Sequence, residues 1–332
     1  MAEYKGIHGT KVQDYTTDPD NPITGQVWYN ETANTIRVQA ETSAGSWATG
    51  GNLNTARNYL AGAGVQTSSL AFGGVNAPTY NYAITESYNG SSWTEVGDLN
   101  TGRATMGGAG SSNTNALAFG GVYATGPAYY NNTETWNGSS WTEVANLNTT
   151  RSLLASAGVS NTSALAAGGF SLPPTPHAQT ELWNGSSWTE VADLNTGRRA
   201  FAGSNGTQTS ALVYGGDNDP PVYALTESWN GSSWTEVADL NVAKLSGAGA
   251  GADNTSALQF GGNDSVSGPV ATTELWNGSS WAETTDLGTA RRNLAGTGTQ
   301  ASALAFGGSP DTASTEEWTG PGVPVVKTIT TD

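Results

Sequence analysis

The sequence has no cysteine, and its 332 residues include only two histidines, His8 and His177. Disulfide bonds, thiolate metal sites and thiol catalysis are therefore excluded, and a histidine-based metal site or a Ser/His/Asp triad has little to draw on. Basic residues are also scarce, because 12 Lys and Arg stand against 28 Asp and Glu, for a formal net charge of −16. Phosphate groups would repel so acidic a chain, so we expect no binding to nucleic acid or to anionic membranes.

Long apolar runs are missing as well. The opening MAEYKGIHGTKVQDYTTDPD lacks the apolar core of a signal peptide, and nowhere does the chain reach the roughly 18 consecutive apolar residues of a membrane-spanning helix. We therefore expect no membrane insertion and no export by a signal peptide. The protein is expected to work inside the cell that makes it, or to leave that cell by lysis.

The abundant residues are glycine, tryptophan and tyrosine, and they follow a repeat. The segment WNGSSWTEVADLN occurs at Trp183–Asn195 and again at Trp229–Asn241. The tryptophan of its SSW element recurs every 46 to 48 residues, at Trp47 (a weaker match), Trp93, Trp141, Trp188, Trp234 and Trp281. Each unit also has an apolar run that ends in Gly-Gly, with the second glycine at Gly74, Gly121, Gly169, Gly216, Gly262 and Gly308. We therefore expect six copies of one structural unit.

Each piece of the unit predicts a short strand. The TE-x-aromatic and SWTEV segments alternate with period two, which is typical of strands with one buried face. The Asn-Gly between them predicts a hairpin turn of type I′, in which both central residues have positive φ. Four short strands in about 47 residues, repeated six times, predict an all-β fold: a six-bladed β-propeller with four-stranded blades. The repeated tryptophans are expected to pack between blades.

The ends of the chain are expected to close the ring and to extend beyond it. The last unit lacks an SSW strand, whereas Gly45–Leu53 supplies one, so blade six is predicted to combine both termini. Gln26–Gln39 predicts a hairpin with its turn at Glu31–Asn34, and this hairpin could compete for the third strand of that blade. The predicted domains are an N-terminal extension (1–42), the propeller (43–320) and a C-terminal tail (321–332).

These motifs resemble the kelch repeat. The shared features are the Gly-Gly that ends one strand, the aromatic residue in the next, the tryptophan after a turn and the Arg about ten residues later. The resemblance covers roughly residues 43 to 320 and implies a kelch-like binding scaffold without assigning an activity. The inner strand, such as RNYLAGAG, is richer in glycine and alanine than is usual in that family.

A second resemblance involves the N-terminal hairpin. GQVWYNETANTIRVQ followed by AGSW is similar to segments of structural and tail-fibre proteins of bacteriophages, especially marine ones. This resemblance implies a virion protein that is made in the host cytoplasm and released by lysis. The expected partners are other virion proteins, bound through the terminal extensions, and a host surface glycan or protein. The protein is expected to be multimeric in that assembly.

One glutamate and one cation recur in each unit. The glutamates are Glu86, Glu134, Glu181, Glu227, Glu274 and Glu316, and the cations are Arg57, Arg103, Arg151, Arg198, Lys244 and Arg291. One interpretation is a ring of charge at the channel mouth that binds an anion. Identical placement in every unit favours the other interpretation, in which each glutamate pairs with a cation or caps backbone N–H groups between blades, since a binding site usually breaks symmetry.

The loops after Gly-Gly differ between units in length, charge and aromatic content, and they are expected to emerge on one face. Function concentrates on variable loops of a rigid scaffold. The predicted ligand-binding residues are Tyr80, Tyr82, Tyr123, Tyr129, Tyr130, Phe170, His177 and Tyr223. The alternative is that they only pack the loops onto the blades. Asp217, Asn218 and Asp219 offer oxygens for Ca²⁺, but three in one turn are weak evidence, and neither a metal nor a cofactor is predicted.

The preferred function is therefore a non-catalytic phage tail-fibre or appendage component that contacts the host through the variable loop face. The alternative is an intracellular kelch-type scaffold for protein interactions. A propeller glycosidase or lyase is a distant third hypothesis, because no pair of acidic residues stands apart from the repeat.

Overall fold

The computed structural model describes residues 12–20, 22–23, 25–41, 44–76, 82–123, 128–172, 175–322 and 324–329. Every helix or strand assigned in these residues is a β-strand, so the prediction of an all-β protein is confirmed. Among them, no helix is long and apolar enough to cross a membrane. The chain forms two compact units. Ser46–Trp318 carries the repeats and is called the propeller-like unit, and Met1–Gly45 with Thr319–Asp332 forms the terminal unit.

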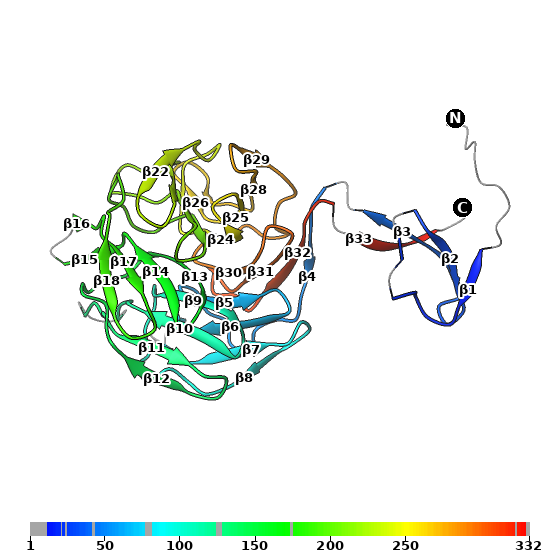
Figure 1. The fold of residues 1–332 in the computed structure, drawn as a ribbon, viewed down its shortest axis with the longest axis horizontal. Helices are drawn as coiled ribbons and strands as arrows, with labels where there is room; N and C mark the ends of the chain where they lie inside the picture. The colour runs from blue at the N-terminus through cyan, green and yellow to red at the C-terminus, as the bar shows by residue number, and fades with distance from the viewer. Residues whose placement is uncertain are drawn as a thin grey trace. The chain divides into compact units, whose positions relative to one another are not determined.

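Six four-stranded sheets build the propeller-like unit, and we number them 1 to 6 by their inner strands. The inner strands, near the middle of the unit in Figure 1, are β5 (Ala61–Val65), β9 (Gly107–Ser112), β13 (Ala155–Ser160), β19 (Gly203–Gly206), β24 (Ala248–Asp253) and β30 (Ala295–Gly298). The second strands are β6 (Ser68–Phe72), β10 (Asn115–Phe119), β14 (Ser163–Ala167), β20 (Ala211–Tyr214), β25 (Ser256–Phe260) and β31 (Ser302–Phe306).

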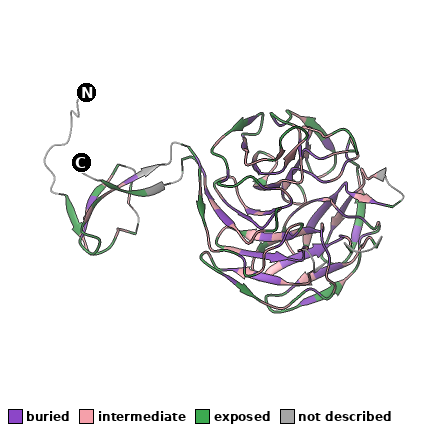
Figure 2. Cartoon of the chain, turned by 180° about the vertical axis from the view of Figure 1, so that it is seen from behind, coloured by how far each residue is buried: buried purple, intermediate pink, exposed green. Residues whose placement is uncertain are grey.

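The outer half of each sheet contains the TE-x-aromatic and SSW elements. The third strands are β7 (Thr85–Tyr88), β11 (Thr133–Trp136), β17 (Thr180–Trp183), β21 (Thr226–Trp229), β28 (Thr273–Trp276) and β32 (Thr315–Thr319). The outer strands are β8 (Trp93–Glu95), β12 (Trp141–Val144), β18 (Trp188–Val191), β22 (Trp234–Val237), β29 (Trp281–Glu283) and β4 (Ser46–Thr49). Figure 2 shows buried residues concentrated inside this unit and exposed residues at its periphery.

The sixth sheet is assembled from distant parts of the sequence. Its strand order is β30-β31-β32-β4, so its outer strand comes from the N-terminal side of the repeats and the other three come from the C-terminal side. The backbone N–H of Gly50, just after β4, donates to the carbonyl oxygen of Thr315 in β32 at 2.9 Å. Pairing of β4 with β32 covers what would otherwise be an open edge.

A closed chain of backbone hydrogen bonds links the six sheets at one end of their inner strands. In each sheet, the residue two positions after the repeated cation donates its N–H to the carbonyl oxygen of its counterpart in the preceding sheet, at 2.7–2.9 Å. These residues, which we call the mouth ring, are Tyr59, Thr105, Leu153, Ala200, Ser246 and Asn293. Tyr59 completes the chain by donating to Asn293.

The Gly-Gly pairs form a second set of links between neighbouring sheets. Both glycines of each pair have φ between 60° and 120°, a region that side chains disfavour. The second glycine donates its N–H to the carbonyl oxygen of the cation in the next sheet, as Gly121 does to Arg151 at 2.9 Å. A Cβ on the first glycine would lie 2.5–2.8 Å from that same oxygen, so only glycine fits.

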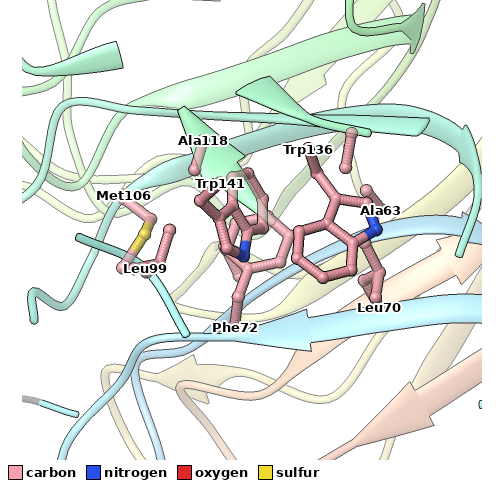
Figure 3. Close-up of a cluster of buried hydrophobic side chains, with 10 residues drawn as sticks. Ala63, Leu70, Phe72, Leu99, Met106, Ala118, Trp136 and Trp141 are labelled. Atoms are coloured by element: carbon pink, nitrogen blue, oxygen red, sulfur yellow. The ribbon is translucent and has the colours of Figure 1, made fainter. Parts of the chain in front are cut away.

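Aromatic residues fill the space between neighbouring sheets. Figure 3 shows the contact between sheets 1 and 2, where Phe72 lies against Trp141 with ring centroids 5.0 Å apart. The indole N–H of Trp141 donates to the hydroxyl of Thr85 in the preceding sheet at 3.0 Å. The other five SSW tryptophans make the same bond to the preceding sheet, including Trp93 to Thr315 and Trp47 to Thr273. Each tryptophan therefore satisfies its polar atom inside an apolar contact.

The hairpin turn between the third and outer strands differs from the predicted type I′. Trp183 pairs with Trp188, which leaves the four residues Asn184 to Ser187 as the loop. Of the turn residues, only Gly185 has a positive φ, at 93°. Asn184 instead accepts hydrogen bonds at its Oδ1 from the backbone N–H groups of Ser186 and Ser187, both at 2.9 Å. The type I′ prediction is wrong because the asparagine side chain, rather than a positive φ at Asn, stabilises the turn.

The terminal unit is a single four-stranded sheet with order β1-β2-β3-β33. Its strands are β1 (Gln13–Tyr15), β2 (Val27–Asn30), β3 (Thr35–Glu41) and β33 (Pro324–Ile329). The hairpin of β2 and β3 therefore occupies this sheet and not the third-strand place of sheet 6. Asp18 anchors one face, since it accepts hydrogen bonds from Asn30 Nδ2 at 2.7 Å and the buried Trp28 Nε1 at 3.0 Å and pairs with Arg37.

Candidate functional site

The repeated cations and glutamates form six ion pairs inside the sheets. Each pair joins a cation that lies four or five positions before an inner strand to a glutamate in the third strand of the same sheet. The pairs are Arg57 with Glu86, Arg103 with Glu134, Arg151 with Glu181, Arg198 with Glu227, Lys244 with Glu274, and Arg291 with Glu316. Both side chains are 0–1% exposed in all pairs except the last, where Glu316 is 11% exposed. These groups lie beneath the surface and do not form an exposed ring of charge.

The second oxygen of each glutamate is also occupied. Glu181 Oε2 accepts bonds from the backbone N–H and the side-chain Nδ2 of Asn148, both at 2.8 Å. The same pair of bonds recurs in sheets 1, 2, 4 and 5, and in sheet 6 Gly288 supplies a backbone N–H at 2.6 Å. Burial lowers the pKa of Arg151, and the charge of Glu181 partly offsets that effect. Each pair thus pins the connection from one sheet to the next, and a bound anion would have to displace a carboxylate.

The buried ion pair of sheet 5 contains a lysine in place of arginine, and a glutamine accompanies it. Lys244 Nζ lies 2.7 Å from Glu274 Oε1 and donates to Gln259 Oε1 at 2.7 Å. Gln259 also donates through Nε2 to the carbonyl oxygen of Gly261 at 2.7 Å. Four other sheets have alanine at this position and use its carbonyl oxygen to bind the arginine, as Ala118 binds Arg103 at 3.4 Å. Gln259 therefore occupies the space that the shorter lysine leaves.

Four of the predicted ligand-binding residues occupy one equivalent position at the base of their loops. The backbone N–H groups of Tyr82, Tyr130, His177 and Tyr223 each donate to the carbonyl oxygen of the second glycine of Gly-Gly, at 2.8 Å. All four residues are half-buried. Their backbones anchor the loops, so the more exposed residues further along each loop are the better candidates for contact with a ligand.

His177 has a further structural contact. Its Nε2 lies 2.8 Å from the hydroxyl of Ser171 in the short hairpin of β15 (Phe170–Ser171) and β16 (Thr175–Pro176). Burial lowers the pKa of His177, and the nearby positive charge of Arg151 lowers it further. The imidazole is therefore kept neutral and holds its own loop together.

A continuous strip of side chains crosses three variable loops. Tyr129 meets Phe170 edge to face, with ring centroids 5.8 Å apart. The guanidinium carbon of Arg199 lies 4.4 Å from the centroid of the Phe170 ring. Arg199 also pairs with Asp217 at 3.1 Å and with Asp219 at 2.9 Å, and the side chain of Asp219 is 76% exposed. We call these five residues the loop strip; it joins an aromatic surface, a cation and exposed carboxylate oxygens.

The loop strip bears on the hypothesis of a Ca²⁺ site. Asp217 and Asp219 both face Arg199, whose positive charge would compete with a cation for their oxygens. Among the described residues, no three His, Asp or Glu side chains are grouped so that they could hold a metal ion. Of the other predicted residues, Tyr123 is 41% exposed, and Tyr80 lies outside the described residues.

Sequence reasoning missed the mouth ring. Its residues line a central cavity of about 240 Å³ that the six inner strands enclose. The residue before each ring member pairs with the start of a variable loop, as Asn58 does with Val75 and Arg199 with Asp217, so this mouth opens on the loop face. The available signal was variation: the ring position holds a different residue in every copy, whereas the cation two residues earlier is nearly constant.

Comparison with models of known protein families finds no match for this chain, and comparison with curated proteins finds none either.

Proposed function

We propose that this chain is a non-catalytic binding protein with a six-bladed, kelch-like β-propeller, and that it belongs to a virus particle as a phage tail-fibre or appendage component. In this proposal, the loop face contacts a host glycan or protein, and the terminal unit attaches the protein to its assembly. The closed chain of hydrogen bonds through the mouth ring supports the number of blades. The hairpin that resembles phage proteins supports the virion assignment.

The binding role is supported by the difference between the constant interior of the repeats and their variable loops. The buried parts of the six repeats use nearly identical contacts, whereas the loop face carries residues that differ in every repeat. The loop strip shows that these differing residues combine across loops into one surface, from Tyr129 through Phe170 to Arg199. Packing alone would not require an exposed carboxylate such as Asp219 on this surface. The non-catalytic assignment rests on the repeated glutamates, whose oxygens are taken up by buried pairs.

The test measures binding of labelled full-length protein to a panel of marine bacterial cells and to a glycan array. Tyr129→Ala with Tyr123→Ser should weaken binding at least about tenfold, because truncating an aromatic anchor at a binding surface typically costs over 1 kcal/mol. Val65→Ser is the matched control, since Val65 is 40% exposed at the far end of β5 from the mouth ring. Equal binding by the loop variant and the wild type would refute the role of the loop face.

The virion assignment has its own test. Mass spectrometry of purified particles from an infected host should detect the chain at a fixed ratio to known capsid proteins. If the chain stays in the lysate and co-purifies with a host protein instead, an intracellular interaction scaffold is the correct function.

A further inference from the structure

The two faces of the terminal sheet (Figure 1) differ in how they are packed. Side chains alternate between the faces along each strand, and the register places Trp28, Asn30 and Gln39 on the same face. These three residues are at most 5% exposed. The segment between β1 and β2 lies against them, since its Asp18 accepts hydrogen bonds from Trp28 and Asn30. This face, which we call the covered face, is therefore packed by the chain itself.

The opposite face, which we call the open face, carries apolar side chains that remain exposed. Two rows of paired residues cross it: Tyr29, Ile36 and Ile329 form one row, and Val27 and Val38 belong to the other. Val27, Ile36 and Ile329 are 39–43% exposed, so no second layer of described residues lies on them. A sheet with an apolar face is stabilised when that face packs against another layer.

Exposed apolar side chains are concentrated in the terminal unit. Of the thirteen large apolar side chains that are exposed in the described residues, six lie there: Val12, Ile23, Val27, Ile36, Val326 and Ile329. The unit holds less than a fifth of the chain. Single exposed apolar residues are normal on a monomer, whereas a continuous group is typical of an interface. Asn34 already accepts a hydrogen bond from the hydroxyl of Tyr29, so burial of that ring would leave no polar atom unpaired.

The charges of the open face favour a second copy of this chain as the partner. Asp14 pairs with Tyr29 from the edge strand β1, and Lys327 pairs with Val38 from the opposite edge strand β33. Both are exposed, and no other charged residue occupies this face in the described strands. A two-fold axis along the strands places β1 of each copy over β33 of the other, so each aspartate faces a lysine. An axis across the strands would place β1 over β1 and bring like charges together.

We infer that the open face binds the open face of a second copy, and that the chain forms a two-fold symmetric dimer through its terminal unit. In this dimer β2 of each copy lies over β3 of the other, so Tyr29 packs on Ile36 of the second copy. Two contacts between Asp14 and Lys327 flank this apolar centre. The inference goes beyond the proposed function, because neither host binding by the loop face nor presence in virus particles requires the dimer.

The size of the open face determines how strong the dimer should be. Four strands about 4.8 Å apart, with four residues in β2 at about 3.3 Å each, give a face of roughly 250 Å² per copy. A stable interface buries roughly 800 Å² per partner, so we expect a weak dimer with a Kd of about 100 µM. Such a contact becomes effective where an assembly holds the copies at high local concentration.

The test measures the mass of the full chain by sedimentation equilibrium at about 5 µM and about 300 µM, below and above the expected Kd. Salt at about 0.15 M screens the repulsion between two chains of net charge −16. The mass should rise from that of the 34.0 kDa monomer toward twice that value. Ile36→Thr should raise the Kd at least about fivefold, because it removes apolar contact from both copies. Val326→Thr is the matched control and should leave the Kd unchanged, since Val326 is equally exposed but lies opposite Gln39 on the covered face.

An exchange of charges tests the symmetry of the dimer. Asp14→Lys and Lys327→Asp should each raise the Kd about tenfold, because each turns both attractive contacts into repulsive ones. An equimolar mixture of these two variants should regain the wild-type Kd, since every contact between the two different chains again joins opposite charges. An effect confined to one chain would not be reversed by mixing.

The inference is overturned if the full chain stays monomeric at about 300 µM, which is the result expected when another part of the same chain covers the open face. It is also overturned if Ile36→Thr and Val326→Thr raise the Kd equally, or if the mixed charge variants associate no more than each variant alone. All four variants should keep the wild-type far-ultraviolet spectrum, because the substituted residues are exposed. Cell binding by the Tyr129 and Tyr123 variant tests only the proposed function.

Discussion

In sheet 5, Lys244 and Gln259 stand where sheets 1, 2, 3 and 6 have arginine and alanine. Replacing Lys244 by Arg and Gln259 by Ala, singly and together, tests whether Gln259 compensates for the smaller cation in its buried ion pair. Gln259 is fully buried, and its amide bridges Lys244 Nζ and the carbonyl oxygen of Gly261, both at 2.7 Å. Gln259→Ala removes a hydrogen bond to a buried charge and should lower the free energy of unfolding by about 1.5–3 kcal/mol. Lys244→Arg places a larger group against Gln259 and should cost about 1–3 kcal/mol through overpacking.

The double variant recreates the Arg and Ala pair of sheets 1, 2, 3 and 6. It should therefore lie within about 1.5 kcal/mol of the wild type, which makes the coupling energy about 1 kcal/mol or more. Urea unfolding followed by tryptophan fluorescence measures all four proteins, and an unchanged m-value shows that the stabilities are comparable. The reverse exchange in sheet 6, Arg291→Lys with Ala305→Gln, is the matched control and should couple with the same sign. If the single effects add to within about 0.5 kcal/mol in both sheets, the compensation argument is wrong.

Three further predictions concern pH, the glycine pairs and the sixth sheet. The pKa of His177 is lowered in the folded protein, so its contribution to stability is complete above the unfolded pKa of about 6.5 and is lost as the pH falls through the lowered folded pKa. His177→Gln should flatten this part of the profile of unfolding free energy against pH, measured by urea titration. An unchanged profile would contradict the prediction. The Cβ of a Gly168→Ala variant would lie 2.7 Å from the Arg198 carbonyl oxygen, whereas the Cβ of a Gly185→Ala variant would have its nearest contact at 3.3 Å. Gly168→Ala should therefore lower the melting temperature several degrees more than Gly185→Ala. Equal decreases in melting temperature would contradict the prediction. A chain that begins at Gly51 lacks β4 and the contact of Trp47 with Phe260. It should have a lower melting temperature and should self-associate in size-exclusion chromatography, because an edge of sheet 6 is exposed. A chain that begins at Ala44 keeps β4 and should not associate, and similar behaviour of the two chains would refute the role of β4.

The strands and their order could be predicted because the same strand pattern occurs six times in the sequence. Period-two alternation reports which face of a strand is buried, and six copies average out the ambiguity of any single segment. The Gly-Gly pairs were readable as strand ends, and the structure explains them by a positive φ and the approach of a carbonyl oxygen. The hairpin turn was predicted in place but not in type, because the Asn184 side chain determines its conformation.

The candidate site was less predictable because it depends on residues that do not repeat. Aromatic composition pointed to the loops, but it could not separate the anchors Tyr82, Tyr130, His177 and Tyr223 from the loop strip. Arg199 stands next to the repeated Arg198 but does not belong to the repeat, so no periodic pattern indicates that it links Phe170 to Asp217 and Asp219.

By itself, the sequence determined the all-β class, the segments that form strands and the residues that each copy must keep, because these follow from local periodicity and from repetition of one packing problem. The sequence also indicated that β4 completes sheet 6, because the last repeat lacks an SSW strand and Gly45–Leu53 supplies one. Only the tertiary structure decided that β33 pairs with β3 and that the mouth ring lines a cavity without charged residues in the described part of the chain. The physical reason is that such contacts join residues tens to hundreds of positions apart. Their meeting depends on how every intervening loop and sheet is placed, and no local pattern records it.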